Sequence, residues 1–277
     1  MLTYWKKIYD NDIVYSCDMI RLSLQFDERY MQEIVGCFNN ILRTDVRVYP
    51  ISYKAFSYKT LITISYNDSS VALGVGFNGA SRDELFKGFL EFNPNKVDCN
   101  LFWDDFCFIK SCCSNVSLVR WDLAIDVPID ILSCSLIKDQ RRYALDMISC
   151  ENKTEYLGVR NTAGRFKMYN KSIESNLPIS LTRLELTCDG FWGSDDIIQH
   201  FPEVYCNNLQ ESISVLNSSD RWLYELLQTH PNKDYFFKTM PRRKKEKLKP
   251  FLYNSLDRFQ LSLFCLSQLV FELNSIL

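Results

Sequence analysis

The spacing of hydrophobic and polar residues changes several times along the chain. Residues 18–27 alternate between apolar and polar side chains, which predicts a β-strand. Residues 28–43 place apolar side chains every three or four positions, which predicts a helix. Runs rich in β-branched and aromatic residues then predict three strands, at 45–56, 59–67 and 71–79. We expect a short helix at 104–113.

The same order begins again at residue 117. Residues 117–127 predict a strand, and residues 128–148, which open with Pro128, predict a helix. Three more strands are expected, at 153–160, 164–171 and 180–188. When the two opening strands are aligned, Ile20 pairs with Val119 and Arg21 with Arg120, which indicates an internal repeat.

A repeat of the β-α-β-β-β type predicts an α+β fold. We expect one largely antiparallel sheet with helices on one face and the opposite face open to a ligand. The duplicated catalytic domain is expected over residues 1–190, with a first copy at about 18–100 and an active copy at about 117–190. Residues 191–277 carry helical patterns and predict a helical C-terminal region.

Composition changes this picture at one segment. The chain has 277 residues, 47% of them hydrophobic, and a formal charge of -2, so its overall charge does not indicate a nucleic-acid partner. Residues 232–250, however, contain eight Lys or Arg and two acids, a local charge of +6. Such a segment attracts phosphates, and we expect DNA contacts there from four residues: Arg242, Arg243, Lys244 and Lys245. The alternative is a solvated surface turn.

The cysteines and the C-terminal residues bear on the compartment. None of the 11 cysteines forms a CxxC pair matched by a second pair, and no secretory leader is recognised, so we expect reduced thiols in a cytoplasmic protein. Residues 258–277 are strongly apolar but include Arg258 and Glu272. We therefore expect an amphipathic helix packed on the protein, with no membrane partner.

Three predicted strands of the second copy place charged side chains on one face. In residues 119–126, Trp121, Leu123 and Ile125 point to one side, and Arg120, Asp122, Ala124 and Asp126 to the other. The same alternation adds two further sets to this polar face. They are Arg165, Lys167, Tyr169 and Lys171 in one strand, and Arg183 and Glu185 in the next.

This polar face has two readings. One is a solvated surface crossed by salt bridges. The other is a reaction centre, in which Asp122, Glu185 and Asp126 hold a hard cation, Mg²⁺ or Mn²⁺, through oxygen ligands. Tyr169 is then the nucleophile that attacks a phosphoryl group, with nearby cations expected to favour its phenolate.

Four blocks in the second copy resemble the replication initiation factor family, which comprises initiators of rolling-circle plasmids and some filamentous phages together with relaxases of conjugative elements. They are an Arg-x-Asp strand at Arg120, a Tyr-Leu-Gly-x-Arg strand at Tyr156, a basic-x-Tyr-x-Lys strand at Lys167 and an Arg-x-Glu strand at Arg183. The resemblance implies an enzyme that nicks one DNA strand at an origin, stays on the 5′ phosphate through a tyrosine, and later rejoins the DNA.

The family's functional residues carry over position by position. Tyr169 matches the tyrosine, and Asp122 and Glu185 match acids of the metal site. Four residues match its basic positions: Arg120, Arg160, Lys171 and Arg183. The chain departs from the pattern at Asn170, where relatives often have an acid, and at Ile173, where some have a second tyrosine. Tyr156 is therefore an alternative nucleophile.

The resemblance also implies partners. We expect single-stranded or extruded origin DNA as substrate, contacted by Arg120, Arg160, Arg165 and Lys167 near the reaction centre. A homodimer, a host helicase and a host polymerase are further expected partners. Two alternatives remain open: a relaxase for conjugative transfer, and a catalytically inactive DNA-binding regulator of the same fold. Initiators with a His-x-His metal motif are excluded, because His200 and His230 are the chain's only histidines.

Overall fold

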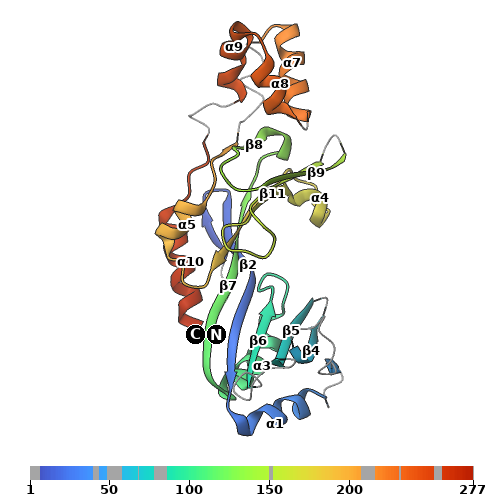
Figure 1. Cartoon of the computed structure of the whole chain (residues 1–277), viewed down its shortest axis with the longest axis vertical. Helices are drawn as coiled ribbons and strands as arrows, with labels where there is room; N and C mark the ends of the chain where they lie inside the picture. Colours follow the sequence, from blue (N-terminus) through green and yellow to red (C-terminus); the bar gives the residue numbers. More distant parts are fainter. Residues whose placement is uncertain are drawn as a thin grey trace.

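The protein is elongated, with a long twisted sheet and a separate group of helices at one end (Figure 1). A computed structural model describes residues 7–39, 44–48, 58–67, 69–77, 86–149, 152–206, 216–230, 232–252 and 258–276. Most of the predicted strand at 45–56 lies outside these residues, as do residues 208–215 of the C-terminal region expected to be helical.

The main sheet is antiparallel and has the order β3-β4-β5-β6-β2-β7-β12-β11-β10-β9, with β1 paired to β2. Its first-half strands are β1 (Ile8–Asp10), β2 (Ile13–Phe26), β3 (Thr44–Val48), β4 (Tyr58–Tyr66), β5 (Ser69–Phe77) and β6 (Lys87–Phe92). Its second-half strands are β7 (Cys113–Val127), β9 (Tyr143–Ser149), β10 (Asn152–Leu157), β11 (Phe166–Asn170) and β12 (Thr182–Asp189).

The two halves of the sheet have the same strand order. In each half the first strand pairs with the last, β2 with β6 and β7 with β12, and the other strands follow outward. The long strands β2 and β7 pair antiparallel at the centre, where Arg21 lies directly opposite Arg120. The halves are therefore related by an approximate twofold axis near this arginine pair.

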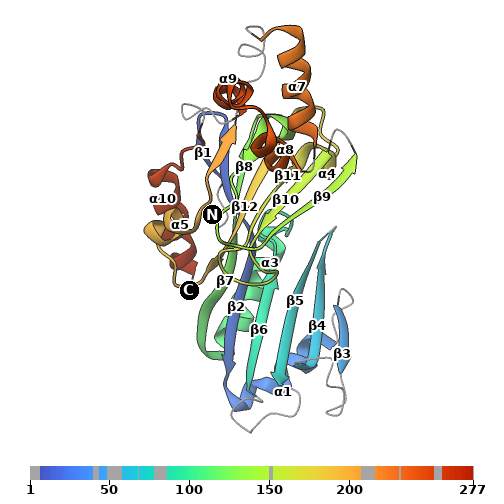
Figure 2. The same ribbon diagram turned by 45° about the horizontal axis from the view of Figure 1, so that its top comes forward.

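One face of the sheet forms the hydrophobic core. Ile20 pairs with Trp121 and Tyr15 with Ile125, so the apolar positions of both halves are continuous across β2 and β7. Helices α1 (Glu28–Asn39), α3 (Cys99–Ser111), α5 (Ser194–His200) and α10 (Leu263–Ile276) add buried side chains to this core. The α+β prediction with helices on one face is confirmed, and Figure 2 shows the strands of the sheet side by side. The polar positions of the paired strands point to the opposite face.

The helix predicted at 128–148 is wrong. This segment forms a 3-10 turn η1 (Ile131–Ser133), a short strand β8 (Cys134–Leu136) and then β9. Ile131 and Cys134 are fully buried, and β8 pairs with β13 (Val204–Cys206) in a small second sheet. Strand β6 was not predicted. Leaving out the short β1, each half of the main sheet therefore has five strands, one more than the predicted unit.

The C-terminal region contains two groups of helices. Helix α10 packs against β1 and β2, as expected for an amphipathic helix, and none of the helices in the described residues is long and apolar enough to span a membrane. The second group comprises α7 (Ser218–Thr229), α8 (Lys233–Thr239) and α9 (Arg242–Leu252). It has its own small core, made by Leu216, Tyr224, Leu227 and Leu248.

Candidate active site

Strand pairing brings the predicted charged residues together on the polar face. Tyr169 of β11 lies opposite Arg183 of β12, and Arg183 lies opposite Asp126 of β7. One step along the strands, Lys167 lies opposite Glu185. Directly paired residues point to the same side of a sheet, so these side chains share one surface.

Tyr169 is held by its neighbours on this surface. Its hydroxyl group donates a hydrogen bond to Glu185 Oε2 at 3.4 Å, and the Lys167 ammonium lies 3.7 Å from the centre of its ring. The residue is only 5% exposed. Burial, and then the negative charge of Glu185, raise the pKa of Tyr169 well above its ordinary value, and Arg183 offsets this only in part. The expectation that nearby cations favour the phenolate is therefore wrong for this arrangement.

Asp126 has a structural partner in place of a metal. Arg183 donates to both of its carboxylate oxygens, at 2.6 and 2.8 Å, and also contacts Asp18 of β2 at 3.0 Å. Both side chains of the Asp126–Arg183 pair are largely buried. With its oxygens engaged by a bidentate guanidinium, Asp126 does not fit as a ligand. Lys171 was expected on the same strand as Tyr169. It instead begins the short helix α4 (Lys171–Ser175) and pairs with Glu174.

Asp122 and Glu185 remain as possible cation ligands. Both line a cavity of about 60 Å³, together with Arg120, Asn161, Arg165, Lys167 and Thr187. Asp122 Oδ1 is buried without a hydrogen-bond partner, and burial raises the pKa of both carboxyls. Two partly buried acids, one of which has an unsatisfied carboxylate oxygen, are the donor set of a hard cation, so the pair fits Mg²⁺ or Mn²⁺.

The protein supplies two side-chain ligands for such an ion, one fewer than the three predicted. Within the described residues, no group of three or more His, Cys, Asp or Glu side chains is placed to hold one metal. An ion bound by Asp122 and Glu185 alone keeps several waters, as Mg²⁺ commonly does, or takes oxygens from the substrate. The cavity exceeds the space that one water needs.

A larger recess of about 660 Å³ adjoins this cavity on the β10 side. The two share Arg165, Lys167 and Glu185, and the larger one adds Arg142, Arg160 and Tyr156. The Arg165 guanidinium lies 5.1 Å from the centre of the Tyr156 ring. Burial, and then Asp146, raise the pKa of Tyr156. Tyr156 thus lines the recess, and Tyr169 lies against Glu185.

The four DNA contacts predicted in the basic segment, Arg242, Arg243, Lys244 and Lys245, lie on α9, remote from the sheet surface (Figure 1). Lys244 and Lys247 both pair with Asp220, a buried acid in the first turn of α7, and these bonds lower the pKa of Asp220. Lys245 donates to the carbonyl of Lys238, and Arg242 pairs with Glu246. Lys244 therefore serves the packing of the helices, whereas Arg243 is exposed.

The sequence did not reveal several residues of this surface. Asp18, Glu91 and Asn161 come to the site through strand register and through the loop between β10 and β11, neither of which the hydrophobic pattern specifies. Thr187, which hydrogen-bonds Asp122, was overlooked in a strand whose neighbours were recognised. Arg21 had a signal, since the repeat aligns it with Arg120.

Comparison with known proteins gives limited results. The sequence matches no protein-family model, and it matches no curated protein. Among solved structures, the fold is similar to that of a rolling circle replication initiator protein from Geobacillus stearothermophilus, with 14% sequence identity and a TM-score of 0.42 over 87% of this chain and 97% of that one.

Proposed function

We propose that the protein is a metal-dependent DNA nicking and joining enzyme that initiates rolling-circle replication. The observation that supports this most directly is the Tyr169 hydroxyl group, which lies 3.4 Å from the Glu185 carboxylate. Glu185 in turn lines two hollows that contain Arg165 and Lys167. A salt-bridged surface alone does not require a phenol beside an acid whose pKa is raised. The four sequence blocks that resemble the replication initiation factor family supply the substrate class.

In this proposal the Tyr169 oxygen forms a bond to the phosphorus of the cut linkage while the bond from that phosphorus to the 3′ oxygen breaks. The 3′ oxygen leaves and takes a proton from water to give the 3′ hydroxyl. Glu185 Oε2 lies within hydrogen-bonding reach of the phenolic proton and accepts it, a role suited to a carboxyl whose pKa is raised. Lys167 and Arg165 line the adjoining recess and orient the phosphate. Asp122 and Glu185 would hold a Mg²⁺ or Mn²⁺ ion, which would supply Lewis-acid polarisation of the phosphoryl oxygen. Arg183 orients the site through Asp126 and Asp18.

The test is a covalent-adduct assay. The protein is incubated with a labelled supercoiled plasmid carrying its own origin and with Mg²⁺ or Mn²⁺, and the adduct is mapped by mass spectrometry. Tyr169→Phe should lower adduct formation by about 10³-fold or more, because it removes the nucleophile. Tyr156→Phe is the matched control and should leave most of the activity. Loss of the adduct in Tyr156→Phe alone would assign the nucleophile to Tyr156.

Two other functions give different results in the same assay. A catalytically inactive DNA-binding regulator binds the origin but forms no adduct with either tyrosine present. A relaxase forms the same adduct, but on a transfer origin and without starting replication of a plasmid in cells.

The proposed partners follow from replication. A nicked origin gives a 3′ hydroxyl for a host polymerase and a single strand for a host helicase. We therefore propose both as partners and the cytoplasm as the location. Exposed cations of α9 such as Arg243 suit the duplex next to the nick. We also propose a homodimer, since two sites help to close the circle, and light scattering at several protein concentrations tests it.

A further inference from the structure

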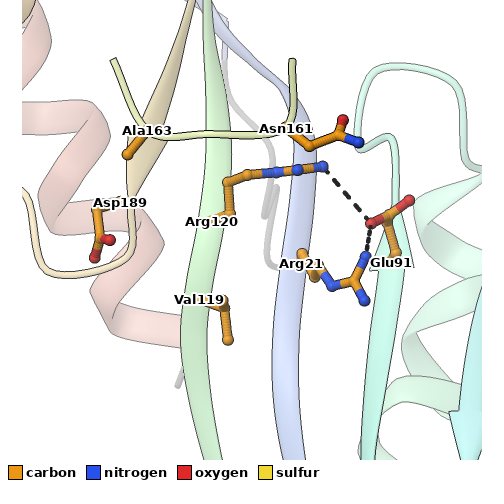
Figure 3. Close-up of a pocket in the computed structure, with 7 residues that line it drawn as sticks. All are labelled: Arg21, Glu91, Val119, Arg120, Asn161, Ala163 and Asp189. Carbon is orange, nitrogen blue, oxygen red and sulfur yellow. Dashed lines mark hydrogen bonds and ion pairs between the residues drawn. The ribbon is translucent and has the colours of Figure 1, made fainter. Parts of the chain in front are cut away.

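A second recess adjoins the cavity of Asp122 and Glu185 on the side away from Tyr156. Its volume is about 490 Å³, and it shares Arg120 and Asn161 with that cavity. Figure 3 shows its remaining lining on three strands: Arg21 on β2, Glu91 on β6, and Val119 beside Arg120 on β7. Ala163 and Asn161 belong to the loop after β10, which crosses over β7 and β2 (Figure 3). Asp189 lies at the end of β12.

The charged residues of this recess follow the approximate twofold axis of the sheet. Arg21 and Arg120 lie opposite each other, and each has an acid opposite it on its outer side, Glu91 for Arg21 and Asp189 for Arg120. Arg21 donates to Glu91 Oε2 at 2.9 Å, and Arg120 lies 3.8 Å from the same oxygen. Two cations and two acids balance, so the recess offers directed donors and acceptors without an excess of positive charge.

The donors are held in place before any ligand binds. The Arg21 guanidinium lies 4.3 Å from the centre of the Phe89 ring. The Phe89 ring packs over Gly74 of the neighbouring strand β5, where an added Cβ would lie 2.1 Å from the ring. The absence of a side chain at Gly74 therefore gives the Phe89 ring a defined position. Arg120 Nε is buried without a hydrogen-bond partner. A buried donor of this kind costs free energy until a ligand or a water accepts from it.

A balanced set of guanidinium and carboxylate groups matches the edge of a base better than a phosphate. Guanine presents acceptors at O6 and N7, to which arginine donates two hydrogen bonds. It also presents N–H groups, from which a carboxylate accepts hydrogen bonds. The small side chains of Val119 and Ala163 leave room for a ring. The recess of Tyr156, by contrast, has four cations against two acids and suits the sugar-phosphate chain.

We propose that the Arg21–Glu91–Arg120 recess binds one unstacked guanine base of the single DNA strand that passes through the reaction centre. This inference rests on the proposed function for its substrate. The Tyr156 recess shares lining residues with the cavity of Asp122 and Glu185, and that cavity shares lining residues with the Arg21–Glu91–Arg120 recess. One DNA strand that passes through all three therefore crosses β10, β11, β12, β7, β2 and β6 in turn. At the spacing of neighbouring strands this path is about 24 Å long, with the phosphate that is cut in the middle and the guanine beside it.

The experiment measures binding without cleavage. Fluorescent oligothymidylate strands of about 12 nucleotides, carrying one central guanine, adenine or cytosine or none, are titrated with the Tyr169→Phe protein and followed by anisotropy. The guanine strand should bind about tenfold more tightly than plain oligothymidylate. Arg21→Gln in the same background should reduce this preference to less than about twofold while plain oligothymidylate still binds.

Two further variants complete the design. Lys87→Gln removes an exposed cation from the same strand as Glu91 and should keep the guanine preference. Glu91→Gln should lose it, and it serves as the second variant if Arg21→Gln unfolds in a thermal melt. An equal loss of affinity for all four strands in Arg21→Gln would mean a phosphate contact and would overturn the proposal, as would the absence of any guanine preference in the parent protein.

The outcome is separable from the nicking activity. If the protein prefers guanine but forms no adduct when Tyr169 is intact, the proposed base site is supported and the proposed nicking chemistry is wrong. A protein that forms the adduct with no base preference loses only the base site.

Discussion

Two carboxylates on adjacent strands of the polar face have opposite environments. Asp126 accepts two hydrogen bonds from Arg183, whereas Glu185 is partly buried near Asp122 and Asp18, and this burial raises its pKa. The first acid stabilises the fold through its partner. Burial disfavours the ionised form of the second acid, which is typical of a group retained for chemistry.

Glu185→Gln should therefore stabilise the protein at pH 7. Because burial raises the pKa of Glu185 in the folded state, protonation of Glu185 adds stability at low pH, and this is lost as the pH rises through the folded-state pKa. Glutamine resembles the protonated form and keeps an acceptor for Tyr169. We expect a melting temperature a few degrees higher than that of the parent at pH 7, with the difference shrinking towards pH 5, measured by calorimetry.

The matched control is Asp126→Asn on the neighbouring strand. It leaves the buried Arg183 with Asp18 as its remaining ion-pair partner among the contacts of the described residues, and should lower the free energy of unfolding by about 2–4 kcal/mol. If both variants shift stability in the same direction, the different roles assigned to the two acids are wrong.

Alternation along single strands was enough to predict which residues share the polar face. Arg120, Asp122 and Asp126 follow from it, as do Lys167 and Tyr169. Alternation cannot predict which residue of the neighbouring strand each side chain lies opposite. The bidentate bond between Arg183 and Asp126, and the burial of Tyr169, depend on register and on the loops above the sheet, so the predicted metal ligand and the predicted phenolate were wrong in detail.

At the scale of elements, the same limit explains the missed strands. Residues 128–148 contain apolar positions that fit a helical period, but Ile131, Cys134 and Leu136 are buried by the core beneath the sheet, and residues from Tyr143 onward pair with β10. Tertiary pairing overrides a short local period in such a segment. The helices α1 and α10, which have long amphipathic patterns, were predicted correctly.

The junction between β12 and β7 depends on a glycine. A Cβ at Gly190 would lie 2.0 Å from the Leu118 carbonyl oxygen, and the Gly190 amide donates to Val119 at 2.9 Å. Gly190→Ala must push β12 away from β7 and should cost about 1–3 kcal/mol or more in urea unfolding. Gly36→Ala in α1 is the control. Nothing lies within 4 Å of its added Cβ, and it should stabilise by about 0.5–1 kcal/mol.

The cations of helix α9 have two different roles: exposed ones are free to contact DNA, and others hold α9 against α7. Arg243→Gln should weaken duplex binding and lower the magnitude of its salt slope by about 1, as expected for one lost phosphate contact, with an unchanged melting curve. Lys244→Gln removes a partner of the buried Asp220 and should instead lower the melting temperature. An unchanged affinity in Arg243→Gln would show that α9 does not contact DNA through this residue.

At the scale of the whole molecule, the two halves share a strand order but differ in chemistry. Ser23 of β2 aligns with Asp122 of β7, and the β6 positions equivalent to Thr187 and Glu185 are Phe89 and Lys87. The first half thus has a lysine and an aromatic ring where the second half has its acid and hydroxyl. It contributes Arg21 and Glu91 at the shared axis, so the repeat builds one reaction centre with one flanking recess.

A divalent cation should link this centre to the stability of the whole protein. Binding of Mn²⁺ or Mg²⁺ to ionised Asp122 and Glu185 relieves the repulsion between two buried acids, so it stabilises the folded state. At a concentration of about 100 times Kd the gain is about 2.7 kcal/mol, which corresponds to a rise of about 5 °C in melting temperature for a protein of this size. Because the carboxyls must be ionised, the rise should be larger at pH 8 than at pH 6, and a chelator should reverse it.

The control for this shift is an acid outside the cavity. Asp195→Asn, at an exposed position in the first turn of α5, should keep the rise with Mn²⁺, whereas Asp122→Asn and Glu185→Gln should each abolish most of it. Both changes also remove a buried charge, so these variants should melt above the parent without metal and close to the metal-bound parent with it. An equal rise in all four proteins would place the ion elsewhere and leave Tyr169 without a metal partner, and no rise in the parent would mean that Asp122 and Glu185 await a cation brought by the DNA.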